Sequence, residues 1–308
     1  MSVPGPPLKV LREVKAMVDS TSPTITAKEL NIARSTLTGW LSQLERKENE
    51  AVQDSPVGRK YLRLRTGTII VGSDFHYWPG DPSVMHRAFV WAIKEFDPKI
   101  VVLNGDVLDF NSISRHPPIG WEDAPEVQDE IEVAQERLHE IELACKKGTK
   151  KLWTLGNHDA RFETKLAHIA PQYKNVLGIH LKDHFDRWTN AWSVFVNDDM
   201  VIKHRFKGGM HAPQNNTLWS GKTMVTGHLH SAKVQPITDY NGTRYGVDTG
   251  CIADTFHPAF QGYTEDNPKN WRGGFGIFTY EDGFLLQPEL ALSVDSNTFQ
   301  FRGKLIKV

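Results

Sequence analysis

Five short apolar runs in this chain each end in a polar cluster that contains aspartate, asparagine or histidine. They are TIIVGSD (68–74), KIVVLNGD (99–106), KLWTLGNHD (151–159), MVIKH (200–204) and KTMVTGHLH (222–230). Short β-branched runs predict buried strands, and the amphipathic stretches that separate the first three predict helices. Such alternation indicates an α/β fold, whose ligand sites form where the strands end. We therefore expect the five clusters to meet at one edge of a sheet.

The clusters carry the side chains that a metal site needs. Carboxylates and imidazoles together suit divalent transition ions. His228 and His230 are two residues apart on an extended segment, so their side chains point the same way. One such residue alone would more often be a turn former or an ordinary buried histidine. Five clusters at five strand ends predict a metal centre.

The blocks D-x-H, G-D-x-x-D, G-N-H-D, H and G-H-x-H, in this order over residues 68–250, resemble the calcineurin-like metallophosphoesterase superfamily. The resemblance implies an α/β fold with an α/β/β/α sandwich of two mixed sheets. It also implies two metal sites that share one carboxylate. One metal would be held by Asp74, His76 and His230, the other by Asn157, His204 and His228, with Asp106 as the bridge and Asp109 as a carboxylate that supports a ligand imidazole.

The resemblance implies phosphoester hydrolysis by a hydroxide that two metal ions activate. His158 would protonate the leaving group, and Asp159 would orient His158. Manganese is the favoured metal, with iron, zinc or nickel as alternatives. Phosphoprotein phosphatases of this superfamily typically have Arg-Gly after G-D-x-x-D, and they use G-N-H-E. This chain has Phe110-Asn111 and Asp159 at these places, so it departs from their pattern. Asp109 stands where purple acid phosphatases have a tyrosine ligand, which argues against a charge-transfer iron site.

Two segments near the clusters are candidates for binding substrate phosphate. Arg115 and His116 follow the second cluster, and a planar guanidinium matches phosphate oxygens. A surface turn explains this segment equally well. His211, after a pair of glycines, allows the same two interpretations.

The first 66 residues differ from the rest in charge. They carry eleven Lys/Arg and seven Asp/Glu, a balance of +4, and none of the thirteen histidines. Residues 25–46 resemble a helix-turn-helix, with a capping box at Thr26 and Glu29, a helix over 26–30, a turn at Asn31 and a second helix over 33–46. We expect a helix-turn-helix-like domain over 1–50, a linker over 51–66 and a catalytic domain over 67–308. The expected DNA contacts are Arg34, Ser35, Thr36 and Thr38 in the groove, with Arg46 and Lys47 near phosphates.

The combination of the two parts resembles the helix-turn-helix phosphoesterases of bacteriophages and mobile elements. Its catalytic part shares a superfamily with Mre11/SbcD-type nucleases. This resemblance predicts a metal-dependent phosphodiesterase or nuclease with DNA as its partner. A phosphoesterase of small nucleotides or cyclic nucleotides, with helices used for self-association, is one alternative. A DNA-binding regulator with a vestigial catalytic domain is another, against which the intact ligand set argues.

Composition narrows the class of protein further. Hydrophobic residues make up 39% and charged residues 24%, which is typical of a soluble globular protein. The sequence has no apolar run of roughly 20 residues and no secretory signal, so we expect a cytoplasmic protein with no membrane partner. Cys145 and Cys251 alone predict no disulfide framework. A homo-oligomer is left open, and the aromatic segment 256–272 is compatible with a lid, a dimer contact or plain packing.

Overall fold

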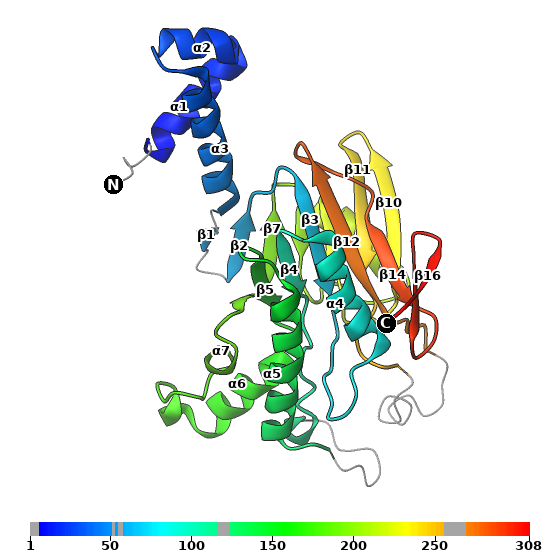
Figure 1. Ribbon diagram of the computed structural model, residues 1–308. Helices are drawn as coiled ribbons and strands as arrows, with labels where there is room; N and C mark the ends of the chain where they lie inside the picture. Colours follow the sequence, from blue (N-terminus) through cyan, green and yellow to red (C-terminus); the bar gives the residue numbers. More distant parts are fainter. Residues whose placement is uncertain (1–5, 51–52, 55–57, 116–123, 256–268) are drawn as a thin grey trace.

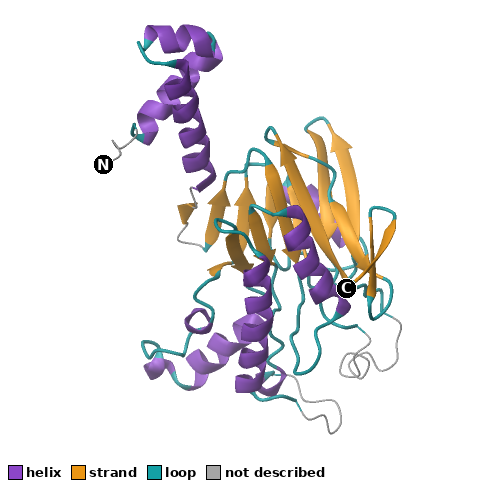
Figure 2. Ribbon diagram, in the orientation of Figure 1, coloured by secondary structure: helices purple, strands orange, loops and turns teal. Residues whose placement is uncertain are grey.

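Two β-sheets packed face to face form the centre of the molecule, and helices cover their outer faces (Figures 1 and 2). The computed structural model describes residues 6–50, 53–54, 58–115, 124–255 and 269–308. The expected α/β/β/α sandwich of two mixed sheets is confirmed. The aromatic segment 256–272 lies mostly outside the described residues.

The larger sheet contains the first three of the strands predicted to carry site residues. Its order is β16-β15-β14-β12-β3-β4-β5-β6, with β13 paired to β12. Strands β3 to β6 are parallel, whereas β12 runs antiparallel to β3. The strands are β3 (Gly67–Gly72), β4 (Ile100–Leu103), β5 (Lys150–Thr154), β6 (Thr189–Ala191), β12 (Gly274–Glu281), β13 (Phe284–Leu285), β14 (Glu289–Ser293), β15 (Thr298–Phe301) and β16 (Lys304–Lys307).

The smaller sheet contains the other two strands that were predicted to carry site residues, β8 and β9. Its order is β1-β2-β7-β8-β9-β11-β10. Its strands are β1 (Gln53–Asp54), β2 (Arg59–Leu62), β7 (Ser193–Val196), β8 (Met200–Ile202), β9 (Thr223–Thr226), β10 (Lys233–Asp239) and β11 (Gly242–Asp248). Strand β2 lies within the expected linker, yet it pairs in parallel with β7 from Arg59↔Ser193 to Leu62↔Val196. Part of the predicted linker is therefore a strand of the sandwich.

Side-chain alternation along the strands builds two apolar layers. In β3, Ile69 and Val71 face the other sheet, whereas Ile70 faces the helices. Because successive side chains point to opposite sides of a strand, a strand that is buried on both faces must be apolar throughout. This explains why the runs that precede the polar clusters are continuous rather than alternating.

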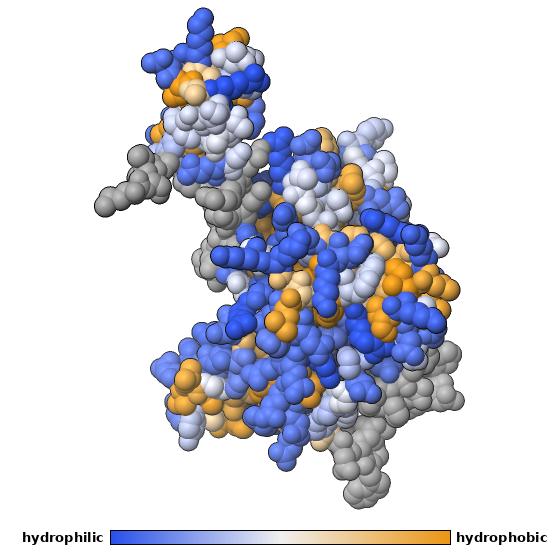
Figure 3. Space-filling model, viewed as in Figure 1, coloured by the Kyte–Doolittle hydropathy of each residue, from blue (hydrophilic) through white to orange (hydrophobic). Residues whose placement is uncertain are grey.

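Helices α4 (Val84–Phe96) and α5 (Val127–Ala144) cover the larger sheet, and α8 (Ala212–Ser220) packs on β9, β10 and β11 of the smaller one. The outward surface over α5 is mainly hydrophilic (Figure 3). The remaining helical segments are η1 (Asn111–Ile113), α6 (Asp159–Ile169), η2 (Pro171–Tyr173) and α7 (Leu181–His184). Within the described part of the chain, none of the helices has the length and apolar character needed to cross a membrane.

Three N-terminal helices project from the sandwich beside β1 and β2 (Figure 1). They are α1 (Leu8–Ser20), α2 (Pro23–Glu29) and α3 (Arg34–Glu50), and Val14, Ala27 and Leu37 form their small core. The predicted capping box is wrong: α2 begins at Pro23, and the hydroxyl of Ser22 caps it by accepting from the Ile25 N–H. Thr26 is instead buried within the helix. Asn31, with φ of 49°, makes the predicted turn between α2 and α3.

Candidate metal centre

The predicted site residues follow five strands whose ends meet between the two sheets. Asp74 and His76 follow β3, Asp106 and Asp109 follow β4, and Asn157 follows β5. His204 follows β8, and His228 and His230 follow β9. Backbone bonds join the loops, because the Asp74 N–H donates to Gly105 and the His76 N–H donates to Asp106. The loops are thus fixed to one another before any ligand binds.

Several of these residues adopt a backbone conformation that L-residues rarely take. Positive φ angles occur at Asp74 (54°), His76 (40°), Asp106 (51°), His228 (71°) and His230 (56°). Non-glycine residues in this region cost free energy, and they concentrate at functional sites where the surroundings hold them. Five in one site indicate that the loops are shaped to present these side chains.

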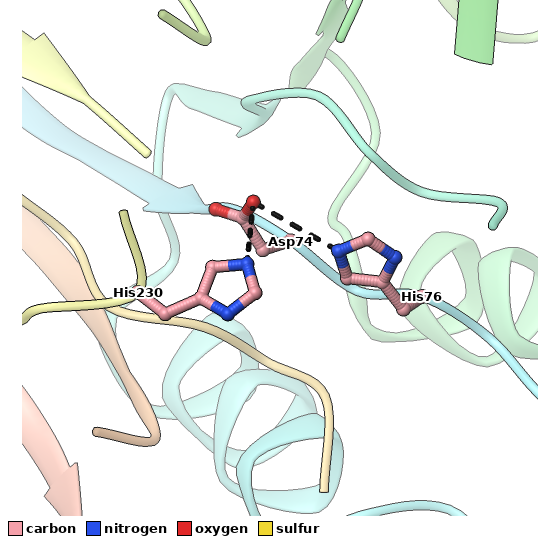
Figure 4. A group of neighbouring side chains, drawn as sticks. All are labelled: Asp74, His76 and His230. Carbon is pink, nitrogen blue, oxygen red and sulfur yellow. Dashed lines mark hydrogen bonds and ion pairs between the residues drawn. The ribbon is translucent and has the colours of Figure 1, made fainter. Parts of the chain in front are cut away.

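Asp74, His76 and His230 form the first group of metal-binding atoms (Figure 4). The Nε2 atom of His230 lies 3.0 Å from Oδ1 of Asp74, and Nε2 of His76 lies 4.0 Å from the same oxygen. The other oxygen of Asp74 accepts from the His228 N–H at 2.8 Å. One carboxylate therefore joins this group to the loop of the next.

Asp106, His204 and His228 form the second group. Nε2 of His204 lies 3.0 Å from Oδ2 of Asp106 and 4.0 Å from Oδ1 of Asp74, so the two groups adjoin. Nδ1 of His204 donates to the Asn104 carbonyl at 2.8 Å, which leaves Nε2 as the coordinating nitrogen. Oδ1 of Asp106 accepts from the His158 N–H at 2.8 Å.

The buried carboxylates of the centre favour bound cations. Burial raises the pKa of Asp74, but the imidazoles of His230 and His204 outweigh it and hold this pKa below its usual range. Burial lowers the pKa of His204, but the carboxylates of Asp106 and Asp74 raise it to about 9. Metal ions at these carboxylates would take over the role of the imidazole protons.

Asn157 supplies the clearest test of whether a metal fits. Its Oδ1 atom is buried and accepts no hydrogen bond from any described residue. A buried acceptor without a partner is costly, and an amide oxygen is a good ligand for a divalent cation. A close glycine keeps this corner open, because a β-carbon at Gly156 would lie 2.1 Å from Oδ1 of Asp106. The residues present fit a pair of metal ions.

Asp109 holds a third group together with His76 and His158. Its Oδ1 lies 3.1 Å from Nδ1 of His76 and 2.6 Å from Nδ1 of His158. Arg161 donates to the Asp109 carbonyl at 2.9 Å and reaches Nε2 of His158 at 3.3 Å. Burial lowers the pKa of His158, but the carboxylates of Asp109 and Asp106 raise it above its usual value.

Asp159 occupies a different place from the one expected of it. Its carboxylate accepts from the N–H groups of Asp106, Val107 and Gly156 at 2.8–2.9 Å and from Nε1 of Trp153 at 3.0 Å. These partners are loop backbone and Trp153, and the carboxylate within hydrogen-bonding distance of the His158 ring is that of Asp109. Burial and the Asp106 charge raise the pKa of Asp159.

A cavity of about 720 Å³ adjoins Asn157 and His204. Arg115 lines it, as expected of a residue that binds substrate, whereas His116 lies outside the described residues. His211 is exposed at the start of α8 and is not among the lining residues. The lining also includes cationic and aromatic residues that the sequence did not single out as site residues: Arg161, Lys165, His168, Trp192, Lys203 and Arg205.

Comparisons with known proteins agree with this geometry. The model of the calcineurin-like phosphoesterase family matches residues 67–249, more than half of the chain, and the chain belongs to this family. It is a metallophosphoesterase with a site for two metal ions built from histidine and aspartate.

Solved structures with a similar fold include wild-type Vps29 with zinc from Entamoeba histolytica (12% identity, TM-score 0.40, 78% of this chain and 98% of that chain). A dimetal phosphatase from Danio rerio has 11% identity and a TM-score of 0.39, over 80% of this chain and 99% of that one. The nuclease MPE of Pseudomonas putida has 12% identity and a TM-score of 0.35, over 73% and 84%. No curated protein matches the chain.

Proposed function

We propose that this metallophosphoesterase hydrolyses phosphodiester bonds in DNA. The observation that carries the proposal is the cavity beside Asn157 and His204. Five cations line it, namely Arg115, Arg161, Lys165, Lys203 and Arg205, and its described lining contains no acidic residue. A single phosphate is far smaller than the roughly 300–1,000 Å³ of typical ligand pockets, so a cavity of about 720 Å³ favours a larger anion.

Two bound divalent cations, manganese by preference, would neutralise charge on the reacting phosphate and make water a better nucleophile near neutral pH. Asp74, His76 and His230 would hold one of them. Asn157, His204 and His228 would hold the other, and Asp106 would bridge the pair. The protein's own part is then to position the phosphate and to supply a proton.

His158 is the proposed proton donor. Asp109 contacts its Nδ1 atom and leaves Nε2 directed toward the site, 3.9 Å from Oδ2 of Asp106. A carboxylate at Nδ1 stabilises the imidazolium, so that Nε2 can give its proton to the leaving oxygen. Arg161 lies 3.3 Å from the same nitrogen. A leaving oxygen within hydrogen-bonding distance of both nitrogens would accept from both.

The N-terminal helices supply the second support for DNA. Arg34, Ser35, Thr36 and Thr38 are all exposed at the start of α3, where a recognition helix meets the major groove. Arg46 and Lys47 are further along the same helix, and their side chains lie outside the described part of the structure. We also propose that the chain is related to the helix-turn-helix phosphoesterases of phages and, more distantly, to Mre11/SbcD-type nucleases.

A substrate panel tests the proposal. The manganese-loaded full chain would be given single-stranded DNA, duplex DNA, bis(4-nitrophenyl) phosphate, mononucleotides and cyclic nucleotides. We expect cleavage of DNA and of the aryl diester. Hydrolysis of mononucleotides or cyclic nucleotides without DNA cleavage would assign a small substrate instead. No hydrolysis with manganese, iron, zinc or nickel would favour the DNA-binding regulator.

A variant of the N-terminal helices separates recruitment from chemistry. Combined Arg34→Ala and Thr38→Ala should weaken DNA cleavage at low DNA concentration far more than it weakens aryl diester hydrolysis. Lys9→Ala, an exposed change on α1, is the matched control. Equal effects of the double variant and the control would assign the helices to assembly.

A further inference from the structure

The cavity contains one large aromatic side chain among its cations. Trp192 lies between β6 and β7 and is 53% exposed, although its indole is a large and mostly apolar ring. The exposed ring lines the same cavity as Asn157 and His204, two ligands of the expected metal centre. An aromatic surface open to solvent beside a phosphate site is suited to stacking a planar ring.

The backbone fixes this tryptophan in place. Its N–H donates to the Gly58 carbonyl at 2.8 Å. A β-carbon at Gly58 would lie 2.7 Å from Cδ1 of the ring, so only glycine allows the close approach of this segment. The ring is therefore supported on one side before a ligand arrives, and little conformational entropy is lost on stacking.

The cations of the cavity come from separate elements of the fold. Arg161 and Lys165 lie on α6, four residues apart and thus on one face of the helix. Lys203 and Arg205 flank His204 after β8. No described carboxylate forms an ion pair with Lys165, Lys203 or Arg205. Their charges remain available to an anion.

We propose that this cavity binds single-stranded DNA, with one base stacked on Trp192 and the flanking phosphates held by Lys203, Arg205 and the cations of α6. The inference rests on the proposed phosphodiesterase function and names the form of its substrate. A duplex keeps its bases paired and stacked on one another, so none of them can reach the indole face. An unpaired strand can offer both its bases and its backbone.

Binding is measured with the metal-loaded full chain that carries Arg34→Ala and Thr38→Ala, the reference protein of this experiment, because these changes remove the proposed duplex contacts of the N-terminal helices. The ligand is a phosphorothioate strand of about 12 nucleotides, a length within the known range of single-strand sites. Phosphorothioates keep the charge and resist cleavage. We expect tighter binding of this strand than of the matching duplex or of single-stranded RNA. Trp192→Ala should weaken binding about five- to a hundred-fold, and Trp192→Phe should weaken it less, because base stacking on an aromatic ring has this magnitude.

Salt dependence reports on the phosphate-binding cations separately. Combined Lys203→Ala and Arg205→Ala should reduce the slope of log K against log salt by about 0.7 for each phosphate that these side chains neutralise in the native protein. The control variants are Trp219→Ala, which removes an exposed tryptophan on α8, and combined Lys304→Ala and Lys307→Ala, which removes two exposed lysines from β16. Each control, made in the reference protein, should match it.

Duplex binding as tight as that of the strand, or tighter RNA binding, would overturn the inference. So would a Trp192→Ala variant that binds like the Trp219→Ala control. Cleavage of DNA by the native protein, together with a reference protein that shows no preference for the strand, would remove this inference and keep the proposed function. Failure to hydrolyse any diester would remove the proposed function itself.

Discussion

Oδ1 of Asp109 lies 2.6 Å from Nδ1 of His158 and 3.1 Å from Nδ1 of His76. One carboxylate oxygen thus orients two imidazoles that have different tasks in the proposed mechanism. His76 would coordinate a metal ion, and His158 would donate a proton. Burial raises the pKa of Asp109, but the two imidazoles outweigh this effect and keep the pKa well below its usual range.

Replacing Asp109 by asparagine should impair proton donation. The amide cannot stabilise an imidazolium at Nδ1, and losses of about ten- to a hundred-fold are typical when such a supporting carboxylate is removed. We expect a larger loss on diesters with poor leaving groups than on activated aryl diesters. Asp186→Asn, an exposed change, is the control. An unchanged leaving-group dependence in Asp109→Asn would contradict the assignment.

Asp159→Ala should destabilise the fold rather than alter proton donation selectively. The change leaves buried N–H donors at Asp106, Val107, Gly156 and Trp153 without their acceptor. Breaking a buried network of this kind costs about 3–5 kcal/mol. Chemical denaturation of the metal-free protein measures the loss. A variant of native stability with a selective defect on poor leaving groups would restore the role first expected of Asp159.

Glu130 should make the metal-free protein less stable as pH rises. Burial raises its pKa from 4.5 to about 7, and its Oε2 accepts from the N–H groups of Asp109 and Phe110. Between these two pH values the folded state holds a proton that the unfolded state has lost. The contribution of Glu130 to the free energy of unfolding is therefore fully present below pH 4.5. It decreases by about 3 kcal/mol as the pH rises to 7.

Glu130→Gln should flatten this pH dependence, because its carbonyl still accepts the backbone bonds and carries no titratable proton. Urea unfolding at pH 5, 6, 7 and 8 with a chelator present is the measurement. Glu136→Gln, exposed on the same helix, should retain the native slope. A native-like slope in Glu130→Gln would show that another group is responsible.

Metal loading should release protons. Without metal, burial lowers the pKa of His204 but the carboxylates of Asp106 and Asp74 raise it to about 9, so the ring is protonated below that pH. Coordination requires the neutral ring. Calorimetric titration with manganese at pH 7.5 in buffers of different ionisation enthalpy counts the protons. His204→Asn should release about one fewer, and an equal count in both proteins would contradict coordination by His204.

The sequence predicted most of what surrounds the metal centre. Continuous apolar runs that end in Asp74, Asp106, Asn157, His204 and His228 correctly indicated strands buried on both faces, because periodicity and strand-end polarity are local signals. No local signal of this kind predicts the position of the Asp159 carboxylate. It depends on loops some fifty residues away in sequence, which folding brings to the start of α6.

The cationic cavity lay beyond sequence reasoning for a related reason. Lys203 and Arg205 flank a predicted ligand, but surface lysines and arginines are common, and only tertiary structure brings them into one cavity with Arg161 and Lys165. Strand β2 was missed because Arg59–Leu62 is short, polar and mostly unpatterned. It becomes a strand by pairing with β7, a contact that no local preference indicates.

The most direct test of the account is the metal content of the purified, manganese-reconstituted chain, measured by elemental mass spectrometry beside its rate on bis(4-nitrophenyl) phosphate. We predict two equivalents per chain in the native protein. In Asp106→Ala we predict fewer than two, with turnover lost, because the carboxylate proposed to be shared is gone. A native protein that retains no more than one ion, or that hydrolyses the diester equally well after chelation, would contradict a paired-metal centre.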